Sequence, residues 1–119
     1  MVDKRGLQPL RATAVLAGGV FGTLLEANMR RYIYKIKTSN QFAGPNQLLL
    51  GYSDDAGATN TVLDYIDHAV QYEMWNDPDE LKEDILPIYI IPAAATPNQI
   101  YLDTDAGDIE VYILYEDSE

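Results

Sequence analysis

Two stretches of the chain share one order of turn-forming and strand-forming residues, and this repeat restricts the fold more than any other feature. Residues 45–50 read Pro-Asn-Gln-Leu-Leu-Leu, and residues 97–102 read Pro-Asn-Gln-Ile-Tyr-Leu. Each stretch soon reaches Asp-Ala-Gly, at residues 55–57 and at residues 105–107. An apolar segment precedes each copy and another follows it, so the repeat indicates a structural unit rather than a single turn.

The repeat predicts a mainly β fold, a sandwich or barrel built from two related three-stranded units. We place the units at about residues 29–67 and 85–117, within a β domain over residues 29–119. The two units should superpose strand by strand, with Tyr65 over Tyr115. The matched residues are Pro, Asn, Asp and Gly, which favour turns in any protein. Shared turn chemistry is therefore the alternative explanation of the match.

Apolar and aromatic residues at strand-like spacing predict the individual elements. Strands are expected at residues 29–38, 48–52, 61–67, 86–91, 99–102 and 109–115. The last two should form a hairpin about residues 105–108, where Gly107 is free to take a positive φ. The final strand is apolar on both faces, which indicates a central strand or a subunit contact.

Alternation along the first of these strands separates its rings from its charges. Tyr32, Tyr34 and Ile36 fall on one face. The other face holds Ile33 and the basic residues, which are Arg31, Lys35 and Lys37. A single-stranded nucleic acid would need the rings and the cations side by side. We therefore interpret this strand as amphipathic, with a basic face that meets acidic protein.

A short helix is expected over residues 78–85. Asp77 can cap its first turn, Pro78 suits the first helical position, and Glu80 suits the third. Pro87 ends the helix, because the residue before a proline disfavours helical geometry. Residues 68–76, just before it, fit a helix and a strand equally well.

Residues 1–28 read as an extended N-terminal arm that packs outside the β domain. Residues 12–25 are apolar and follow a basic start, which resembles the core of a signal peptide. Three glycines among these residues oppose a helix, and two short strands about Gly18-Gly19 fit them better. We interpret the arm as a docking segment. The residues expected at the interface are Lys4, Arg5, Arg11, Val15, Leu16, Val20, Phe21, Leu24, Leu25, Arg30 and Arg31.

Charge is distributed unevenly along the chain. Residues 1–40 hold seven basic and two acidic residues, whereas residues 41–119 hold only Lys82 against seventeen acidic residues. The basic end can pair with the acidic end of the same chain or of a neighbour. The net charge of −11 opposes binding to nucleic acid and to anionic membranes.

Candidate chemistry is sparse. Asp103, Asp105, Asp108 and Glu110 form an oxygen-rich stretch of the kind that binds Ca²⁺. The calcium-loop pattern is incomplete, however, so we interpret the stretch as a solvated turn without a metal. His68 is the only histidine and there is no cysteine, so acid–base and nucleophilic catalysis have little support. No cofactor is expected.

These features predict a non-enzymatic structural or interaction subunit of a larger homomeric assembly. In general character the chain resembles the small decoration proteins on the capsid surface of tailed viruses, which combine an arm with a compact β domain. That resemblance implies a location in the virion, with copies of the chain or a capsid shell protein as partners. The alternative is a stand-alone β-sandwich binding module, for example for carbohydrate, that uses exposed tyrosines and Trp75.

Overall fold

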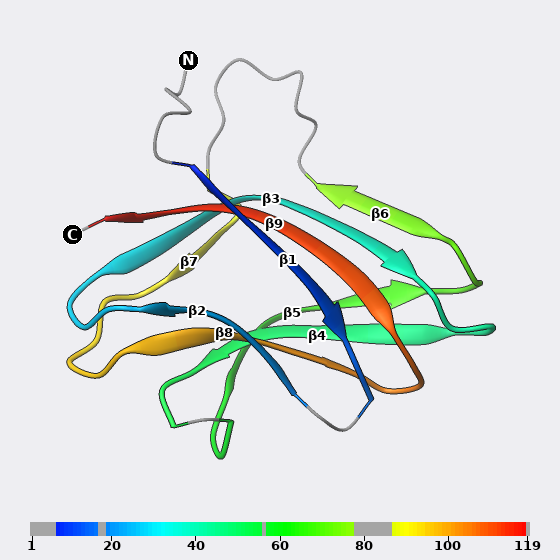
Figure 1. Ribbon diagram of the computed structural model, residues 1–119, viewed down its shortest axis with the longest axis horizontal. Coiled ribbons are helices and arrows are strands. Elements are labelled where there is room, and N and C mark those ends of the chain that lie inside the picture. The colour runs from blue at the N-terminus through cyan, green and yellow to red at the C-terminus, as the bar shows by residue number, and fades with distance from the viewer. Residues whose placement is uncertain (1–6, 17–18, 56, 78–86, 119) are drawn as a thin grey trace.

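The computed structural model describes residues 7–16, 19–55, 57–77 and 87–118, and this part of the protein is an all-β sandwich. Its strands form two antiparallel sheets, here called sheet A and sheet B (Figure 1). Sheet A contains β1 (Gln8–Ala14), β3 (Arg30–Asn40), β6 (Met74–Asp77), β7 (Tyr89–Ile91) and β9 (Ile109–Ser118). Sheet B contains β2 (Val20–Leu25), β4 (Asn46–Ser53), β5 (Thr61–His68) and β8 (Asn98–Thr104).

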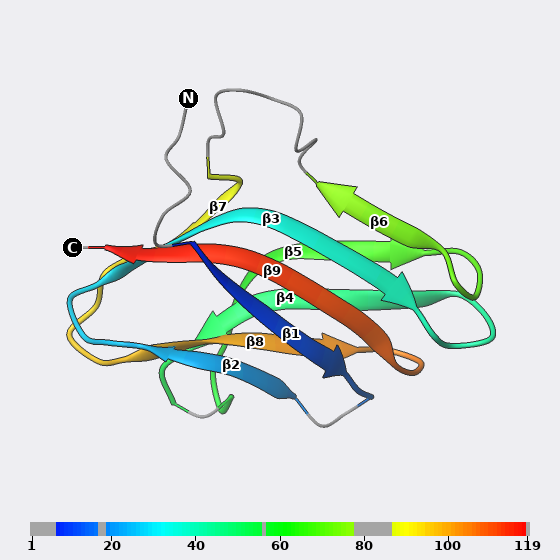
Figure 2. The same ribbon diagram turned by 45° about the horizontal axis from the view of Figure 1, so that its top comes forward.

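The strands pair in a nested order. Sheet A runs β1-β9-β3-β6, and the short β7 also pairs with β3. Sheet B runs β2-β8-β4-β5. Thus β1 pairs with β9, β2 with β8, β3 with β6 and β7, and β4 with β5, as if one long hairpin were rolled into two layers (Figure 2). With β6 and β7 sharing one position, this is the strand order of an eight-stranded jelly roll.

The hydrophobic core lies between the two sheets, and its buried residues are aliphatic except for Tyr115. Along β3, β4, β8 and β9, buried and more exposed residues largely alternate because successive side chains point to opposite faces. The buried hydrophobic residues are Ala14, Leu25, Ile33, Ile36, Leu48, Leu50, Ile66, Ile91, Ile100, Leu102, Ile109, Val111, Ile113 and Tyr115. Both sheets contribute to this set, so neither sheet is stable in water without the other.

The predicted three-stranded repeat is wrong in its last strand. The third strand of the first unit, β5, lies at the edge of sheet B, whereas the third strand of the second unit, β9, lies inside sheet A. Tyr65 is 52% exposed and Tyr115 is 2% exposed, so the two tyrosines are not equivalent. The matched prolines each precede a strand that begins with a buried asparagine, Asn46 or Asn98. The similarity therefore reflects shared requirements at the start of a strand.

The expected N-terminal arm is also corrected. Residues 8–14 and 20–25 are strands β1 and β2 of the sandwich, and Ala14 and Leu25 belong to its core. Pro9 is compatible with β1 because β1 is an edge strand, where a missing N–H can face solvent. Gly22 is closely packed, since a Cβ there would lie 2.8 Å from a methyl carbon of Leu10 and 3.2 Å from the Cβ of Ile100. Residues 1–6 lie outside the described part.

Three further local predictions have different outcomes. The hairpin about residues 105–108 is wrong, because β8 lies in sheet B and β9 in sheet A, so this turn crosses between the layers. Gly107 is required there for close approach rather than for a positive φ, since its Cβ would lie 2.6 Å from the Phe42 ring. The final strand, β9, is central in its sheet, as predicted. The predicted helix over residues 78–85 lies outside the described residues.

A β-bulge in β3 changes which residues face outward. The pairing with β9 shifts between Ile33 and Lys35, so Tyr34 is an extra residue in the strand. Before the bulge Ile33 points into the core, and after it Ile36 does so, although the two are three residues apart. The predicted separation of rings from cations is therefore wrong. Tyr32 and Lys37 share the outer face of sheet A.

Candidate interaction surfaces

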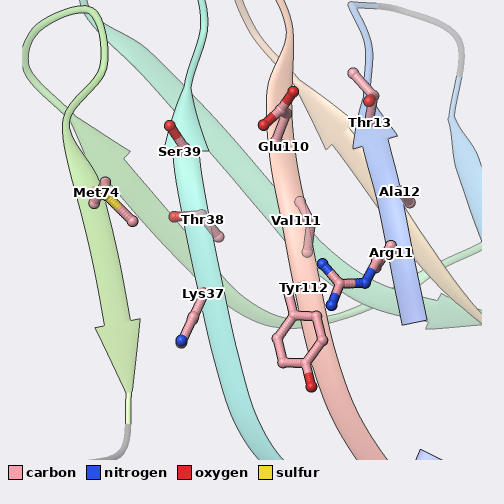
Figure 3. A pocket seen from close by; sticks show the side chains of 10 residues that line it. All are labelled: Arg11, Ala12, Thr13, Lys37, Thr38, Ser39, Met74, Glu110, Val111 and Tyr112. Carbon is pink, nitrogen blue, oxygen red and sulfur yellow. The ribbon is translucent and has the colours of Figure 1, made fainter. Parts of the chain in front are cut away.

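A groove crosses the outer face of sheet A. One wall is a row of three residues at the same register, Arg11 on β1, Tyr112 on β9 and Lys37 on β3. The other wall is the next outward row, which is Thr13, Glu110, Ser39 and Met74. The groove encloses about 500 Å³. Figure 3 shows these side chains rising from β1, β9, β3 and β6, with sheet B behind them.

The basic wall of the groove is partly organised by an aromatic ring. The Arg11 guanidinium carbon lies 4.7 Å from the centre of the Tyr112 ring, which is cation–π geometry. Arg11 therefore covers one face of this ring. Lys37 stands beside Tyr112 on the neighbouring strand, and Glu110 is the acidic residue of the opposite wall. The groove thus offers donors on one side and a carboxylate on the other.

The outer face of sheet B is acidic and partly apolar. Asp103 on β8 and Asp67 on β5 point outward by strand alternation. Tyr65, which is 52% exposed, and Val62, which is 38% exposed, lie on the same face of the edge strand β5. Asp67 also accepts a hydrogen bond of 2.7 Å from the Gln47 side chain. Tyrosine is enriched at protein interfaces, so the exposed Tyr65 marks this face as a candidate contact surface.

The two outer faces differ in charge. Every lysine and arginine of the described residues lies on β1 or β3, so the described part of sheet B has none. On the outer face of sheet A the exposed or half-exposed charges are basic at Arg11, Arg30 and Lys37. They are acidic at Glu110 and Glu116. Within the described part, sheet A therefore has a mildly basic outer face and sheet B an acidic one.

Exposed apolar side chains also gather at the turn between β5 and β6. Val70, Tyr72 and Met74 are 59%, 67% and 70% exposed. The turn is held by the buried Asn40, whose side chain donates to the Val70 carbonyl at 2.9 Å and whose own carbonyl accepts from the Tyr72 N–H at 2.7 Å. Tyr72 has φ 64, a left-handed conformation that is uncommon for a bulky residue. Such strain persists only where the surroundings enforce it, and it is often found at functional sites.

Two of the basic residues predicted at the interface have different environments. Arg30 is exposed on the outer face of sheet A. Arg31 is fully buried and donates to both carboxylate oxygens of Asp117, at 2.7 and 2.9 Å. It also donates to the Thr23 carbonyl at 2.7 Å and stacks 4.1 Å from the centre of the Tyr115 ring. Arg31 therefore joins the two sheets and is not accessible to a partner.

The other predicted interface residues that the structure describes lie on β1, on β2 and between them. Arg11 is exposed in the groove. Leu16 and Leu24 are 53% and 50% exposed, Val15, Val20 and Phe21 are half-buried, and Leu25 is in the core. Lys4 and Arg5 lie outside the described residues.

The acidic stretch of the last turn does not converge on one point. Asp103 faces outward from sheet B and Glu110 faces outward from sheet A. One carboxylate oxygen of Asp105 accepts the Gln47 N–H at 2.8 Å. Asp108 is exposed beyond it. Within the described residues no three histidine or acidic side chains are grouped as they would be to hold a metal ion.

His68 is a buried residue at the contact between the sheets. Its Nε2 lies 2.8 Å from the hydroxyl of Thr38, and its Nδ1 lies 3.3 Å from a carboxylate oxygen of Glu73. The imidazole therefore connects β5 to β3 and to the turn before β6. It points into the sandwich and lies beneath the groove, whose lining includes its partner Thr38.

Burial and local hydrogen bonding shift the pKa of three groups on these surfaces. Burial raises the pKa of Tyr34, and the nearby Glu116 carboxylate adds to this effect. Burial likewise raises the pKa of Tyr101, with a contribution from Asp103. Both tyrosines therefore remain neutral hydrogen-bond donors at neutral pH. The Thr59 N–H lowers the pKa of Asp55, which is exposed in the turn after β4.

Sequence reasoning missed the groove and the turn that carries Tyr72. The groove depends on pairing between β1, β9 and β3, which are far apart in the chain. The turn had one available signal. In residues 70–74 apolar side chains alternate with polar ones, at Val70, Tyr72 and Met74. No partner strand was predicted for this segment, so its apolar side chains could be expected on the surface.

Comparison with known proteins found no family model, no curated protein and no solved structure that matches this chain. No helical segment of the described residues has the length and apolarity needed to cross a lipid bilayer.

Proposed function

We propose that this chain is a non-enzymatic structural subunit that assembles with copies of itself, of the kind that covers or reinforces a viral capsid. The observation that carries the proposal is the strained, hydrogen-bonded turn that displays Val70, Tyr72 and Met74. Three large apolar side chains on an ordered turn are costly to leave in water, and aromatic residues of this kind often provide most of the affinity of an interface.

The architecture supports the same proposal by analogy. Jelly rolls form viral capsid domains, and they also form lectins and enzymes, so fold alone does not decide the function. The exposed apolar residues Leu16, Leu24 and Ile90 lie on further parts of the surface, at 53%, 50% and 47% exposure. A subunit with several neighbours needs more than one contact surface, and this distribution fits such a role. On this proposal the protein is located in the virion and its partners are copies of itself or the shell protein.

The direct test is the mass of the protein in solution. Sedimentation velocity should give particles well above the 13.3 kDa of one chain at micromolar concentration. Replacing Val70, Tyr72 and Met74 together by Ser should weaken assembly by about 30-fold or more, because each is an exposed contact candidate. Leu24→Ser removes a comparably exposed side chain from β2, on one of the further surfaces, and its effect shows how much of the loss is specific to the turn. A wild-type chain that stays monomeric, or a triple variant that assembles normally, would contradict the proposal.

A second candidate function is carbohydrate binding in the groove of sheet A. The groove presents the charged groups of Arg11, Lys37 and Glu110 beside the hydroxyl of Ser39, which suits the dense hydroxyls of a sugar. One observation weighs against it, because Arg11 covers a face of the Tyr112 ring on which a sugar would stack. A monomeric chain that binds a soluble oligosaccharide, and loses that binding on Glu110→Gln, would favour this candidate.

A further inference from the structure

We infer that the subunits contact one another through unlike faces, with Tyr65 of one copy seated in the sheet A groove of the next. This inference rests on the proposed self-assembly and names one of its interfaces. The occupant is a second copy of the chain, because the acidic outer face of sheet B complements the basic wall of the groove.

The groove has the dimensions and chemistry for a tyrosine side chain. Its walls are outward rows two residues apart along the strands, a spacing of about 7 Å, which admits the edge of an aromatic ring. Its volume of about 500 Å³ exceeds the size of one side chain, so neighbouring groups can enter with the ring. Met74, which is 70% exposed, offers an apolar contact, and the Glu110 carboxylate can accept a hydrogen bond from a tyrosine hydroxyl.

Tyr65 is the side chain that matches this groove. It is 52% exposed on an edge strand, where no further strand of the described residues limits access to it. Asp67 follows two residues later on the same face and can reach Lys37 or Arg11 when the ring is seated. Asp103 extends the negative charge to β8. One aromatic anchor flanked by complementary charges is a common arrangement at interface hot spots.

The size of the faces allows such a contact. The molecule measures 41 by 37 by 17 Å, so its two broad faces are those of the two sheets. Each face has room for the roughly 800 Å² per partner that a stable interface buries. Contact between unlike faces is heterologous, and repeated contacts of this type give a ring when the rotation closes and an open array when it does not.

The test uses two charge-reversed full-length variants. In Arg11→Glu/Lys37→Glu the outer faces of both sheets are acidic. In Asp67→Lys/Asp103→Lys the outer faces of both sheets are basic. Each variant alone should assemble about 100-fold more weakly than wild type, because like charges meet at the contact. An equimolar mixture should regain assembly, since each basic face again finds an acidic one. Sedimentation velocity at low salt measures all three samples.

Two further variants separate the ring from general charge effects. Tyr65→Ala should weaken assembly by about 30-fold, while Tyr65→Phe, which keeps the ring and loses the hydroxyl, should cost less than about tenfold. Glu26→Lys is the charge control, since it removes an exposed acid in the turn after β2 and should leave assembly unchanged. Thermal unfolding confirms that each variant is folded.

The possible outcomes are distinct. Recovery on mixing, with loss on Tyr65→Ala, supports contact between unlike faces. Wild-type assembly that is insensitive to both charge reversals overturns this inference and leaves the proposed function standing. Failure of the mixture to recover points to contact between like faces and also overturns it. If wild-type protein is monomeric, both the inference and the proposed function fail. Binding of an oligonucleotide to the groove at physiological salt would replace the second copy as its occupant.

Discussion

Removal of the Asp117 carboxylate is expected to destabilise the fold strongly. Asp117 accepts two hydrogen bonds from Arg31, at 2.7 and 2.9 Å, and Arg31 has no exposed side-chain surface. In Asp117→Ala the guanidinium stays buried with only the Thr23 carbonyl and the Tyr115 ring beside it. Breaking a buried ion pair on one side typically costs about 3–5 kcal/mol.

The lower end of this range applies here. The Asp117 side chain is 24% exposed, so water can reach part of the space that the substitution opens. We therefore expect a loss of about 3 kcal/mol in the free energy of unfolding, out of the roughly 5–15 kcal/mol typical of a domain. With an m-value of about 1.5 kcal/mol/M, the urea midpoint falls by about 2 M. Equilibrium urea unfolding, followed by tryptophan fluorescence and by circular dichroism, measures the change.

Two comparisons isolate the cause. The double variant Arg31→Met/Asp117→Ala removes both charges, so it should be more stable than the sum of the two single losses implies, by about 1–3 kcal/mol. Glu116→Ala, which removes the neighbouring outward-facing carboxylate, should change stability by less than about 0.5 kcal/mol. A loss below about 0.5 kcal/mol in Asp117→Ala would refute the reasoning, because it would mean that the buried guanidinium does not depend on this partner.

Two other properties can be checked on the same protein. Gly51→Ala should destabilise the protein by about 1–3 kcal/mol, because the new Cβ would collide with the carbonyl oxygen of Thr61 on the edge strand β5. The control is Gly44→Ala, whose Cβ would make ordinary contact at 3.4 Å. Equal losses of stability for the two variants in urea unfolding would contradict this prediction. The hydrogen bond from the Thr59 N–H lowers the pKa of Asp55, so this carboxyl should titrate below the ordinary value of about 3.9. Because the folded pKa is depressed, its stabilising contribution is present above about pH 4 and is lost as the pH falls through the folded pKa. Carboxyl NMR titration gives the midpoint, and a midpoint at or above about 3.9 would disprove it.

Most strands could be predicted because their side-chain period is a local property. Six segments of mixed apolar and aromatic residues were expected as strands, and β3, β4, β5, β7, β8 and β9 coincide with them apart from their ends. β1 was harder to predict, because Pro9 and Arg11 interrupt its apolar pattern. Both residues are tolerated because one side of this edge strand faces no neighbour and because alternate positions point to solvent.

Strand pairing could not be predicted from the same signals. The short Asp-rich turn at residues 105–108 has the composition of a hairpin, yet its flanking strands belong to different sheets. Turn residues specify that the chain reverses, but they do not specify whether it returns to the same sheet. That choice depends on which apolar faces meet across the core. In a jelly roll, strands from opposite ends of the sequence also lie side by side in one sheet, as in the pairing of β1 with β9.

The bulge at Tyr34 links the core to the proposed interface. Ile33 and Ile36 both have no exposed surface, and a regular strand would place residues three apart on opposite faces. One inserted residue is therefore the means by which β3 buries both isoleucines. The same shift turns Lys37 outward, into line with Tyr112 and Arg11. Without the bulge, a strand that buried Ile33 would also point Lys37 toward the core, so the burial of Ile36 and the basic wall of the groove follow from the same irregularity.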